Sequence, residues 1–261
     1  MIPDLDHRFA FAEQLIRDAG AVAMNYFRRV AELEVNSKGP RDMVSEADVA
    51  VEELIKDRLA AAYPTDAFLG EESGYAEIAD RSGIWVVDPI DGTQPFVSGL
   101  PSWCVSIAYV GGDELRFGMV YNPAADELFT GGTGRPARRN GHLIRPHPGR
   151  ALGDGLVFLG CSPRVTASQV VPVLDRLLTG GGMFVRSGSG ALGLCDVACG
   201  RLLGYVEPHI NSWDCLGAIA VLRAAGARVN DFLTGDALLN GNWIVAAPPA
   251  MYRTMYDLLQ G

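Results

Sequence analysis

The chain has 261 residues, of which 48% are hydrophobic and 20% are charged, so it is long enough to bury a sizeable core. Its formal charge of −9 and pI near 4.9 argue against a nucleic-acid binder, because a phosphate backbone attracts concentrated Lys and Arg. No apolar run reaches the roughly 18 residues that span a bilayer, and the first residues lack a signal-peptide pattern. We therefore expect a cytoplasmic protein that binds neither nucleic acid nor membrane.

The first part of the chain is typical of helices followed by strands. Residues 7–30 and 45–63 carry apolar side chains at spacings of three and four, which predicts two amphipathic helices. The strand candidates that follow are residues 84–88, 103–110, 115–122 and 127–132. This order favours an antiparallel sheet covered by a helical layer.

One cluster of basic residues follows these strands. Arg135, Arg138 and Arg139 lie in the Gly/Pro-rich stretch "GTGRPARRNG". A solvated loop is the interpretation that such a composition favours.

After the turn region at residues 146–153, strand and helix candidates alternate. The strand candidates are residues 155–160, 183–186, 202–207 and 243–247. The helix candidates are residues 166–178, 191–199 and 213–226. Alternation of this kind predicts a mostly parallel sheet, so we expect two units, residues 1–150 and residues 151–261.

The five cysteines show neither a CxxC pair nor a histidine at a metal-ligand spacing. They are Cys104, Cys161, Cys195, Cys199 and Cys215. Apolar neighbours predict that they are small reduced core residues. Cys195 and Cys199 share one face of an expected helix, but two thiols without a second pair make a poor zinc site.

The stretch "WVVDPIDGT", residues 85–93, places Asp88 and Asp91 three positions apart at the end of an apolar strand candidate. Pro89 cannot extend a strand ladder and Gly92 permits unusual backbone angles, so we expect the chain to leave the sheet at Asp88. A plain turn explains an isolated motif of this kind equally well, since Asp, Pro and Gly all form turns.

Two further acidic groups stand at the ends of other elements. Glu71 and Glu72 follow an apolar run in "FLGEESG", and Asp214 stands at the expected start of a helix in "NSWDCLGA". A solvated loop and an N-terminal helix cap are the plain alternatives. Gathering these carboxylates is unfavourable unless a cation neutralises them. Oxygen ligands without His or Cys favour magnesium, manganese or calcium over zinc.

The segments "GEESG", "WVVDPIDGT" and "WDCLGA", in this order and at these separations, resemble the inositol monophosphatase family of lithium-sensitive, magnesium-dependent phosphatases. The resemblance extends from "SEAD" near residue 45 to "WIVAA" near residue 247. It implies a layered α-β-α-β-α sandwich, commonly a homodimer. That fold agrees with an α+β first half around an antiparallel sheet and an α/β second half around a mostly parallel one.

The resemblance also implies a metal site for two or three Mg²⁺ ions, with Mn²⁺ able to substitute. Glu71, Asp88 and the backbone carbonyl of Ile90 correspond to the ligands of one metal ion. Asp88, Asp91 and Asp214 correspond to the ligands of the next.

Asp48 and Thr93 correspond to the water-activating couple of the family, and Glu71 is counted with them as catalytic. Asp48 would accept the proton of the Thr93 hydroxyl, which would orient the attacking water. Asp48 has a structural alternative as well, because it stands three residues after Ser45 and completes the pattern of a helix capping box.

Substrate contacts are implied in both halves. Backbone N–H groups of Gly92 and Thr93, at the start of a short helix, would bind the phosphate. In the second half, residues that resemble the family's polyol site are Ser189, Gly190, Ala191 and Glu207. Close helix packing is the plain explanation of the glycines there, and a solvated strand end is that of Glu207.

Two other classes of function compete with a phosphatase. Gly188, Gly190 and Gly193 spell GxGxxG, and Glu207 follows nineteen residues after the first of them, which is the outline of an NAD-binding oxidoreductase. That hypothesis leaves the acidic clusters unexplained. A non-enzymatic metal-binding or regulatory protein is the other class. Its signature would be loss of the Asp48 and Thr93 couple, and both residues are present.

Departures from the family pattern bear on the substrate. After "DPIDGT" the commonest continuation in the family resembles Thr-Asn-Phe, whereas this chain has Gln94, Pro95 and Phe96. Trp103 is similar to the histidinol-phosphate phosphatase branch, but "RSGSGALG" lacks that branch's Trp-Gly-Asp signature. We therefore predict a Mg²⁺-dependent phosphomonoesterase that acts on a small polyol phosphate. Inositol-1-phosphate is the first candidate substrate and histidinol phosphate is the alternative.

Overall fold

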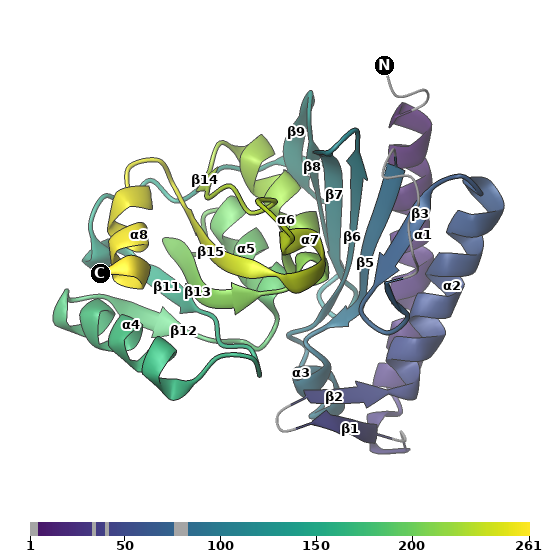
Figure 1. The fold of residues 1–261 in the computed structure, drawn as a ribbon, viewed down its shortest axis with the longest axis horizontal. Helices are drawn as coiled ribbons and strands as arrows, with labels where there is room; N and C mark the ends of the chain where they lie inside the picture. The colour runs from purple at the N-terminus through teal and green to yellow at the C-terminus, as the bar shows by residue number, and fades with distance from the viewer. Residues whose placement is uncertain (1–4, 33–34, 40–41, 76–82) are drawn as a thin grey trace.

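A computed structural model describes residues 5–32, 35–39, 42–75 and 83–261, which form five layers in the order α-β-α-β-α (Figure 1). The outer helices beside the first sheet are α1 (Leu5–Phe27) and α2 (Glu46–Ala62). Between the two sheets lie α5 (Gly190–Ala198) and α6 (Ser212–Ala225). The outer helices beside the second sheet are α4 (Ala167–Thr179) and α8 (Tyr252–Gln260). The layered sandwich expected from the resemblance is therefore confirmed.

The first sheet is antiparallel except for one pairing, that of β3 with β5. Its strand order within the described ranges is β10-β9-β8-β7-β6-β5-β3-β4. The bounds are β3 (Ala67–Gly70), β4 (Gly74–Tyr75), β5 (Gly83–Asp91), β6 (Cys104–Gly111), β7 (Glu114–Asn122), β8 (Glu127–Gly132), β9 (Arg135–Arg139) and β10 (His142–Leu143). A separate hairpin pairs β1 (Val35–Gly39) with β2 (Asp42–Ser45). All four strand candidates of the first half are confirmed.

The second sheet has the order β12-β11-β13-β15-β14. Its bounds are β11 (Leu156–Leu159), β12 (Met183–Val185), β13 (Gly204–Ile210), β14 (Arg228–Val229) and β15 (Asn242–Ala247). β11 runs parallel to β12 and β13, whereas β15 runs antiparallel to β13 and β14. The carboxyl ends of the three parallel strands therefore meet at one edge of the sheet, which is where ligands bind in folds of this kind.

Short helices complete the described chain. They are α3 (Thr93–Val97), α7 (Ala237–Asn240) and two 3₁₀ turns at Val30–Glu32 and Leu152–Asp154. None of the helices in the described ranges is both long and apolar enough to cross a membrane. All five cysteines are free, and three of them, Cys104, Cys195 and Cys215, are buried.

The strands of the first sheet precede residue 150 and those of the second follow it, but the two sheets share a core. One buried cluster joins Ile84 and Val86 of β5 with Phe158 of β11 and Ile244 of β15. The side chains of α5 and α6 fill the space between. Groups at the ends of both sheets are consequently held at fixed positions relative to one another.

A pair of glycines brings α6 against the first sheet. A Cβ on Gly118 of β7 would lie 2.2 Å from the carbonyl oxygen of Gly217 on α6, and a Cβ on Gly217 would lie 2.5 Å from Oγ of Ser106 on β6. Larger residues would push the helix away from the sheet. This contact holds Asp214, one turn before Gly217, close to the end of β5.

Two local predictions are wrong. Arg135, Arg138 and Arg139 lie in strand β9, which pairs with β8, and not in a solvated loop. Side chains alternate between the two faces along this strand, which makes a basic stretch compatible with a sheet, because it exposes Arg138 while Arg135 pairs with Asp6.

The second correction concerns the end of β5. This strand does not end at Asp88 but continues to Asp91. Its ladder with β6 shifts register between Asp88 and Asp91, where Pro89 has no N–H to donate. The irregularity lets the strand keep both aspartates at its end.

Candidate metal and phosphate site

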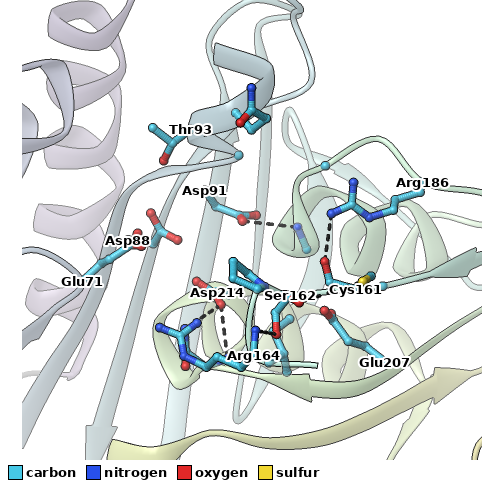
Figure 2. Close-up of a pocket in the computed structure, with 18 of the residues that line it drawn as sticks. Glu71, Asp88, Asp91, Thr93, Cys161, Ser162, Arg164, Arg186, Glu207 and Asp214 are labelled. Atoms are coloured by element: carbon cyan, nitrogen blue, oxygen red, sulfur yellow. Dashed lines mark hydrogen bonds between the residues drawn. The ribbon is translucent and has the colours of Figure 1, made fainter. Parts of the chain in front are cut away.

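A cavity of about 160 Å³ opens where the carboxyl ends of β5, β11, β12 and β13 approach one another (Figure 2). The N-terminal half contributes Glu71, Asp88, Ile90, Asp91, Gly92 and Thr93 to its lining. The C-terminal half contributes Glu207, Asp214 and the residues that follow β11 and β12. The volume lies below the range for drug-sized ligands, so the cavity suits a small substrate.

Glu71, Asp88 and Asp214 form a compact acidic cluster, with one carboxylate oxygen of each within 4.8 Å of the others. They come from the turn after β3, from β5 and from the first turn of α6, and they point toward one another (Figure 2). Oδ2 of Asp88 is buried and meets no N–H or O–H donor in the described part of the chain. A buried carboxylate oxygen among other carboxylates fits a bound hard cation such as Mg²⁺ or Mn²⁺.

The raised pKa values in this cluster also favour a bound cation. Burial raises the pKa of Asp88 well above its usual range, and the charges of Glu71, Asp91 and Asp214 raise it further. Burial also raises the pKa of Asp214. A divalent cation would reverse these shifts, because its attraction favours the ionised carboxylates.

Asp91 is held by the C-terminal half of the chain. Its Oδ2 accepts hydrogen bonds from Oγ of Ser189 and from N of Ala191, each at 2.6 Å, and its Oδ1 accepts one from N of Gly190 at 3.3 Å. Burial and the charge of Asp214 raise the pKa of Asp91 to about 7, although these hydrogen bonds oppose the rise. Ser189 and Ala191 are buried behind Asp91, whereas Gly190 lines the cavity.

These contacts also bear on the GxGxxG segment. The N–H groups at the start of α5, which a pyrophosphate would need in a dinucleotide site, donate to Asp91. The strand before that helix, β12, lies at the edge of its sheet. Both facts argue against an NAD-binding oxidoreductase.

Two acids of the site also cap helices. Oδ2 of Asp48 accepts hydrogen bonds from N and Oγ of Ser45 at 2.8 and 2.5 Å, and Oδ1 accepts one from Oγ1 of Thr93 at 3.1 Å. The capping box and the contact with Thr93 thus use different oxygens of one buried carboxylate. At α6, Oδ2 of Asp214 accepts a hydrogen bond from N of Asn211 at 3.2 Å.

Thr93 and Ile90 lie together beside the acidic cluster. Oγ1 of Thr93 lies 3.3 Å from the carbonyl oxygen of Ile90, and both residues line the cavity. The N–H of Ile90 donates to Oδ1 of Asp88 at 3.0 Å. Gly92, the residue before α3, completes this wall.

Glu207 lines the opposite side of the cavity and is only 4% exposed, so it is not a solvated strand end. The hydroxyl of Tyr205 donates to its Oε2. Burial raises the pKa of Glu207 to about 8, and the charges of Asp214 and Asp91 add to the rise, while Tyr205 and Arg186 oppose it.

The cavity lining also includes two arginines that were not among the predicted site residues, Arg164 and Arg186. Nη2 of Arg186 donates to the carbonyl oxygen of Cys161 at 2.9 Å (Figure 2). Arg164 follows the end of β11 and Arg186 follows the end of β12. The rule that ligands bind beyond the carboxyl ends of parallel strands is the signal that points to them.

Trp103 and His209 lie outside the cavity lining. The side chain of Trp103 is fully buried and packs against Phe27 and Phe96. Nε2 of His209 lies 2.9 Å from the carbonyl oxygen of Asn240, and the residue is not part of the cavity lining.

Comparison with known proteins places this geometry in context. Residues 4–260 match the model of the inositol monophosphatase family. The Nus factor SuhB of Haemophilus influenzae is 35% identical over 248 residues, which are 94% of this chain and 92% of that protein.

Two solved structures have a similar fold. The extragenic suppressor protein SuhB from Bartonella henselae matches with a TM-score of 0.89 at 31% identity, over 96% of this chain and 97% of the other. The inositol monophosphatase from Anabaena (Nostoc) sp. matches with a TM-score of 0.84 at 29% identity, over 98% and 96% of the two chains.

The raised pKa of Glu207 predicts a pH-dependent effect of Glu207→Gln on stability. A carboxyl group with a pKa of about 8 in the folded state and about 4.5 when unfolded stabilises the fold below pH 4.5 and loses that contribution as pH rises through 8. The free energy of unfolding of Glu207→Gln minus that of the parent protein should therefore increase as pH rises from 5 to 9, by at most about 4 kcal/mol. Urea denaturation in chelator at several pH values measures this. A difference between the two proteins that does not change with pH would contradict it.

Proposed function

Because the chain belongs to the inositol monophosphatase family, we propose that it is a Mg²⁺-dependent phosphomonoesterase that hydrolyses a small polyol phosphate, with inositol-1-phosphate as the first candidate. The contact between Thr93 and Asp48 at 3.1 Å, beside the cluster of Glu71, Asp88 and Asp214, carries the proposal. A metal-binding protein without catalysis would need the cluster but not this couple.

The proposed metal ligands are the carboxylates of the cluster with Asp91 and the carbonyl oxygen of Ile90. In full they are Glu71, Asp88, Ile90, Asp91 and Asp214. When bound, Mg²⁺ would supply positive charge to the phosphate oxygens and lower the pKa of the attacking water. The unpartnered Oδ2 of Asp88 supports this assignment.

Thr93 and Asp48 would orient the water that attacks phosphorus. When the Thr93 hydroxyl donates its proton to Oδ1 of Asp48, the lone pairs of Oγ1 are free to accept a hydrogen bond from water. The capping contacts of Ser45 fix the carboxylate of Asp48, so the acceptor is held in position before substrate arrives. Glu71, in the acidic cluster beside Thr93, would share in activating this water.

The substrate would lie between the two halves. The N–H groups of Gly92 and Thr93, at the start of α3, would bind phosphate oxygens. Glu207 and Gly190 would face the hydroxyl groups of the leaving alcohol, since both line the cavity. Ser189 and Ala191 would contribute to substrate binding through Asp91, which they hold.

A non-catalytic role is the competing hypothesis, and the name of the Haemophilus relative, Nus factor SuhB, refers to no hydrolysis. We favour catalysis because Asp48 and Thr93 are both present and in contact. The formal charge of −9 supports the expectation that nucleic acid is not a partner. The free cysteines support a location in the reducing cytoplasm.

We further propose that the protein is a homodimer. Strand β12 lies at the edge of its sheet beside α4 (Figure 1). Its side chains Met183 and Phe184 are 61% and 43% exposed, and Val171 and Leu178 of α4 are exposed as well. An apolar sheet edge of this kind is unfavourable in water and is commonly covered by a partner.

Phosphate release from a panel of substrates tests the proposed activity. The panel contains inositol-1-phosphate, histidinol phosphate, fructose-1,6-bisphosphate and 3′-phosphoadenosine-5′-phosphate, each with Mg²⁺ and with chelator. We expect Mg²⁺-dependent release that is fastest with inositol-1-phosphate, because Trp103 does not reach the cavity where an imidazole would bind. Fastest release from histidinol phosphate would assign the other branch. No release from any substrate by protein that binds Mn²⁺ would favour a non-catalytic role.

Thr93→Ala should lower turnover by roughly ten- to ten-thousand-fold, the usual range for a group that positions a proton transfer. Thr93→Ser is the matched control, because it keeps the hydroxyl that donates to Asp48 and should retain most of the activity. Steady-state kinetics at saturating Mg²⁺ measures both variants. Turnover of Thr93→Ala equal to that of the parent protein would remove Thr93 from the mechanism.

Replacing Met183 and Phe184 together by Glu should convert the dimer to a monomer, because charges at the edge of β12 would oppose association. Leu143→Glu is the control, since Leu143 is 62% exposed on β10 of the other sheet. Light scattering after size-exclusion chromatography gives the mass of each. A parent protein with the mass of one chain, or a double variant with the mass of two, would rule out this interface.

A further inference from the structure

A buried carboxylate lies beneath the turn that carries Glu71. Glu52, on α2, is only 3% exposed. Its Oε2 accepts a hydrogen bond from N of Glu72 at 2.9 Å, and its Oε1 accepts one from N of Ser73 at 2.7 Å. A Cβ on Gly70 would lie 2.3 Å from Oε2 of Glu52, so the carboxylate is packed against the strand that leads into the turn.

The chemistry of this contact calls for a carboxylate. Two neighbouring backbone N–H groups of a turn need two acceptors, and a carboxylate offers both, whereas an amide offers one acceptor and one donor. Burying the charge of Glu52 is unfavourable by itself, and the two hydrogen bonds offset part of that cost. An apolar side chain would fill the same space without holding the turn.

The turn matters because it carries Glu71, the residue directly before the two N–H groups of Glu72 and Ser73. Glu71 follows β3 directly, and its carboxylate is one of three that lie within 4.8 Å of one another, with Asp88 and Asp214. We propose that Glu52 is a positioning residue of the metal site, which holds the turn of residues 71–73 so that Glu71 points at the other two ligands. This inference rests on the proposed function in that it takes Glu71 to be a metal ligand.

The spacing on α2 supports the same conclusion. Asp48 and Glu52 are four residues apart, so they lie on one face of the helix. Asp48 contacts Thr93, and Glu52 contacts the turn after Glu71. Both acids interrupt an otherwise apolar buried face, and each holds a different part of the site from behind.

Metal binding by Glu52→Gln tests the inference directly. The NH₂ group of the glutamine would lie opposite one of the two backbone N–H groups, and two donors cannot form a hydrogen bond with each other. The turn would therefore lose one hydrogen bond and move. Calorimetric titration of the full chain with Mn²⁺ in the absence of substrate measures the affinity. Glu52→Gln should bind Mn²⁺ roughly 10- to 100-fold more weakly than the parent protein, as for other groups that orient a metal ligand. Glu53→Gln, an exposed neighbour on the same helix, should bind Mn²⁺ like the parent protein.

A second variant approaches the contact from the turn. Ser73→Pro removes the N–H that donates to Oε1 of Glu52 and leaves Glu52 in place. Ser73→Ala keeps that N–H and serves as its control. We expect weaker Mn²⁺ binding by Ser73→Pro and unchanged binding by Ser73→Ala. Circular dichroism shows which variants are folded, so the test does not depend on one substitution.

A double-mutant cycle separates positioning from general damage. In the background of Glu71→Gln, where the ligand itself is lost, Glu52→Gln should weaken Mn²⁺ binding little further, because both changes act through the same carboxylate. In the kinetics, Glu52→Gln should raise the Mg²⁺ concentration for half-maximal activity by roughly 10- to 100-fold.

The outcomes distinguish this inference from the proposed function. Unchanged Mn²⁺ affinity in folded Glu52→Gln, or a full additive loss in the Glu71→Gln background, would overturn the role of Glu52 and leave the phosphatase proposal intact. A parent protein that binds no Mn²⁺ and releases no phosphate would overturn the proposed function and the role of Glu52 with it.

Discussion

The structure depends on the burial of like charges where its two halves meet. Asp88 and Asp91 end a strand of the first sheet, and Asp214 begins the helix that lies between the sheets. Gly118 and Gly217 let that helix approach the sheet closely, so Asp214 cannot move away from Asp88 without opening the core. The mutual repulsion of these acids is built into the packing, and a bound cation is the simplest way to relieve it.

The second half of the chain holds Asp91 of the first half in place. The start of α5 donates three hydrogen bonds to Asp91, which belongs to the first sheet. The N–H groups of a helix start favour a negative charge, so they keep Asp91 oriented even though burial raises its pKa. The proposed metal site therefore requires both halves, and residues 1–150 alone would lack Asp214 as well as the donors to Asp91.

Much of this could be predicted from the sequence, because the elements that matter have strong local patterns. The helices of the first half have clear apolar periodicity, and their observed bounds, Leu5–Phe27 and Glu46–Ala62, lie close to the predicted ones. The acids of the cluster stand in motifs that resemble a known family. These signals are local, so they survive without knowledge of the tertiary structure.

What the sequence did not reveal depends on contacts between distant residues. Strand β9 is rich in arginine and proline, and its pairing with β8 and β10 makes it a strand. Ser189 was assigned to the polyol site, yet its hydroxyl reaches Asp91, 98 positions earlier. Glu52 belongs to no recognisable motif. Its partners are backbone N–H groups about 20 residues away, and residues of almost any type could supply them. Spacing along the chain carries no information about such partners.

The burial of Glu207 bears on the proposed choice of substrate. Its pKa rises to about 8, and the largest cause is burial, with the charges of Asp214 and Asp91 contributing less. A cation that neutralises Asp214 and Asp91 would remove their contribution to the raised pKa of Glu207, whereas the larger contribution of burial would remain. A carboxyl group that is largely protonated at neutral pH can donate a hydrogen bond to an alcohol and offers little attraction to a cationic amine. This chemistry supports the proposed neutral polyol substrate over histidinol phosphate, which would bring a cationic amine to Glu207.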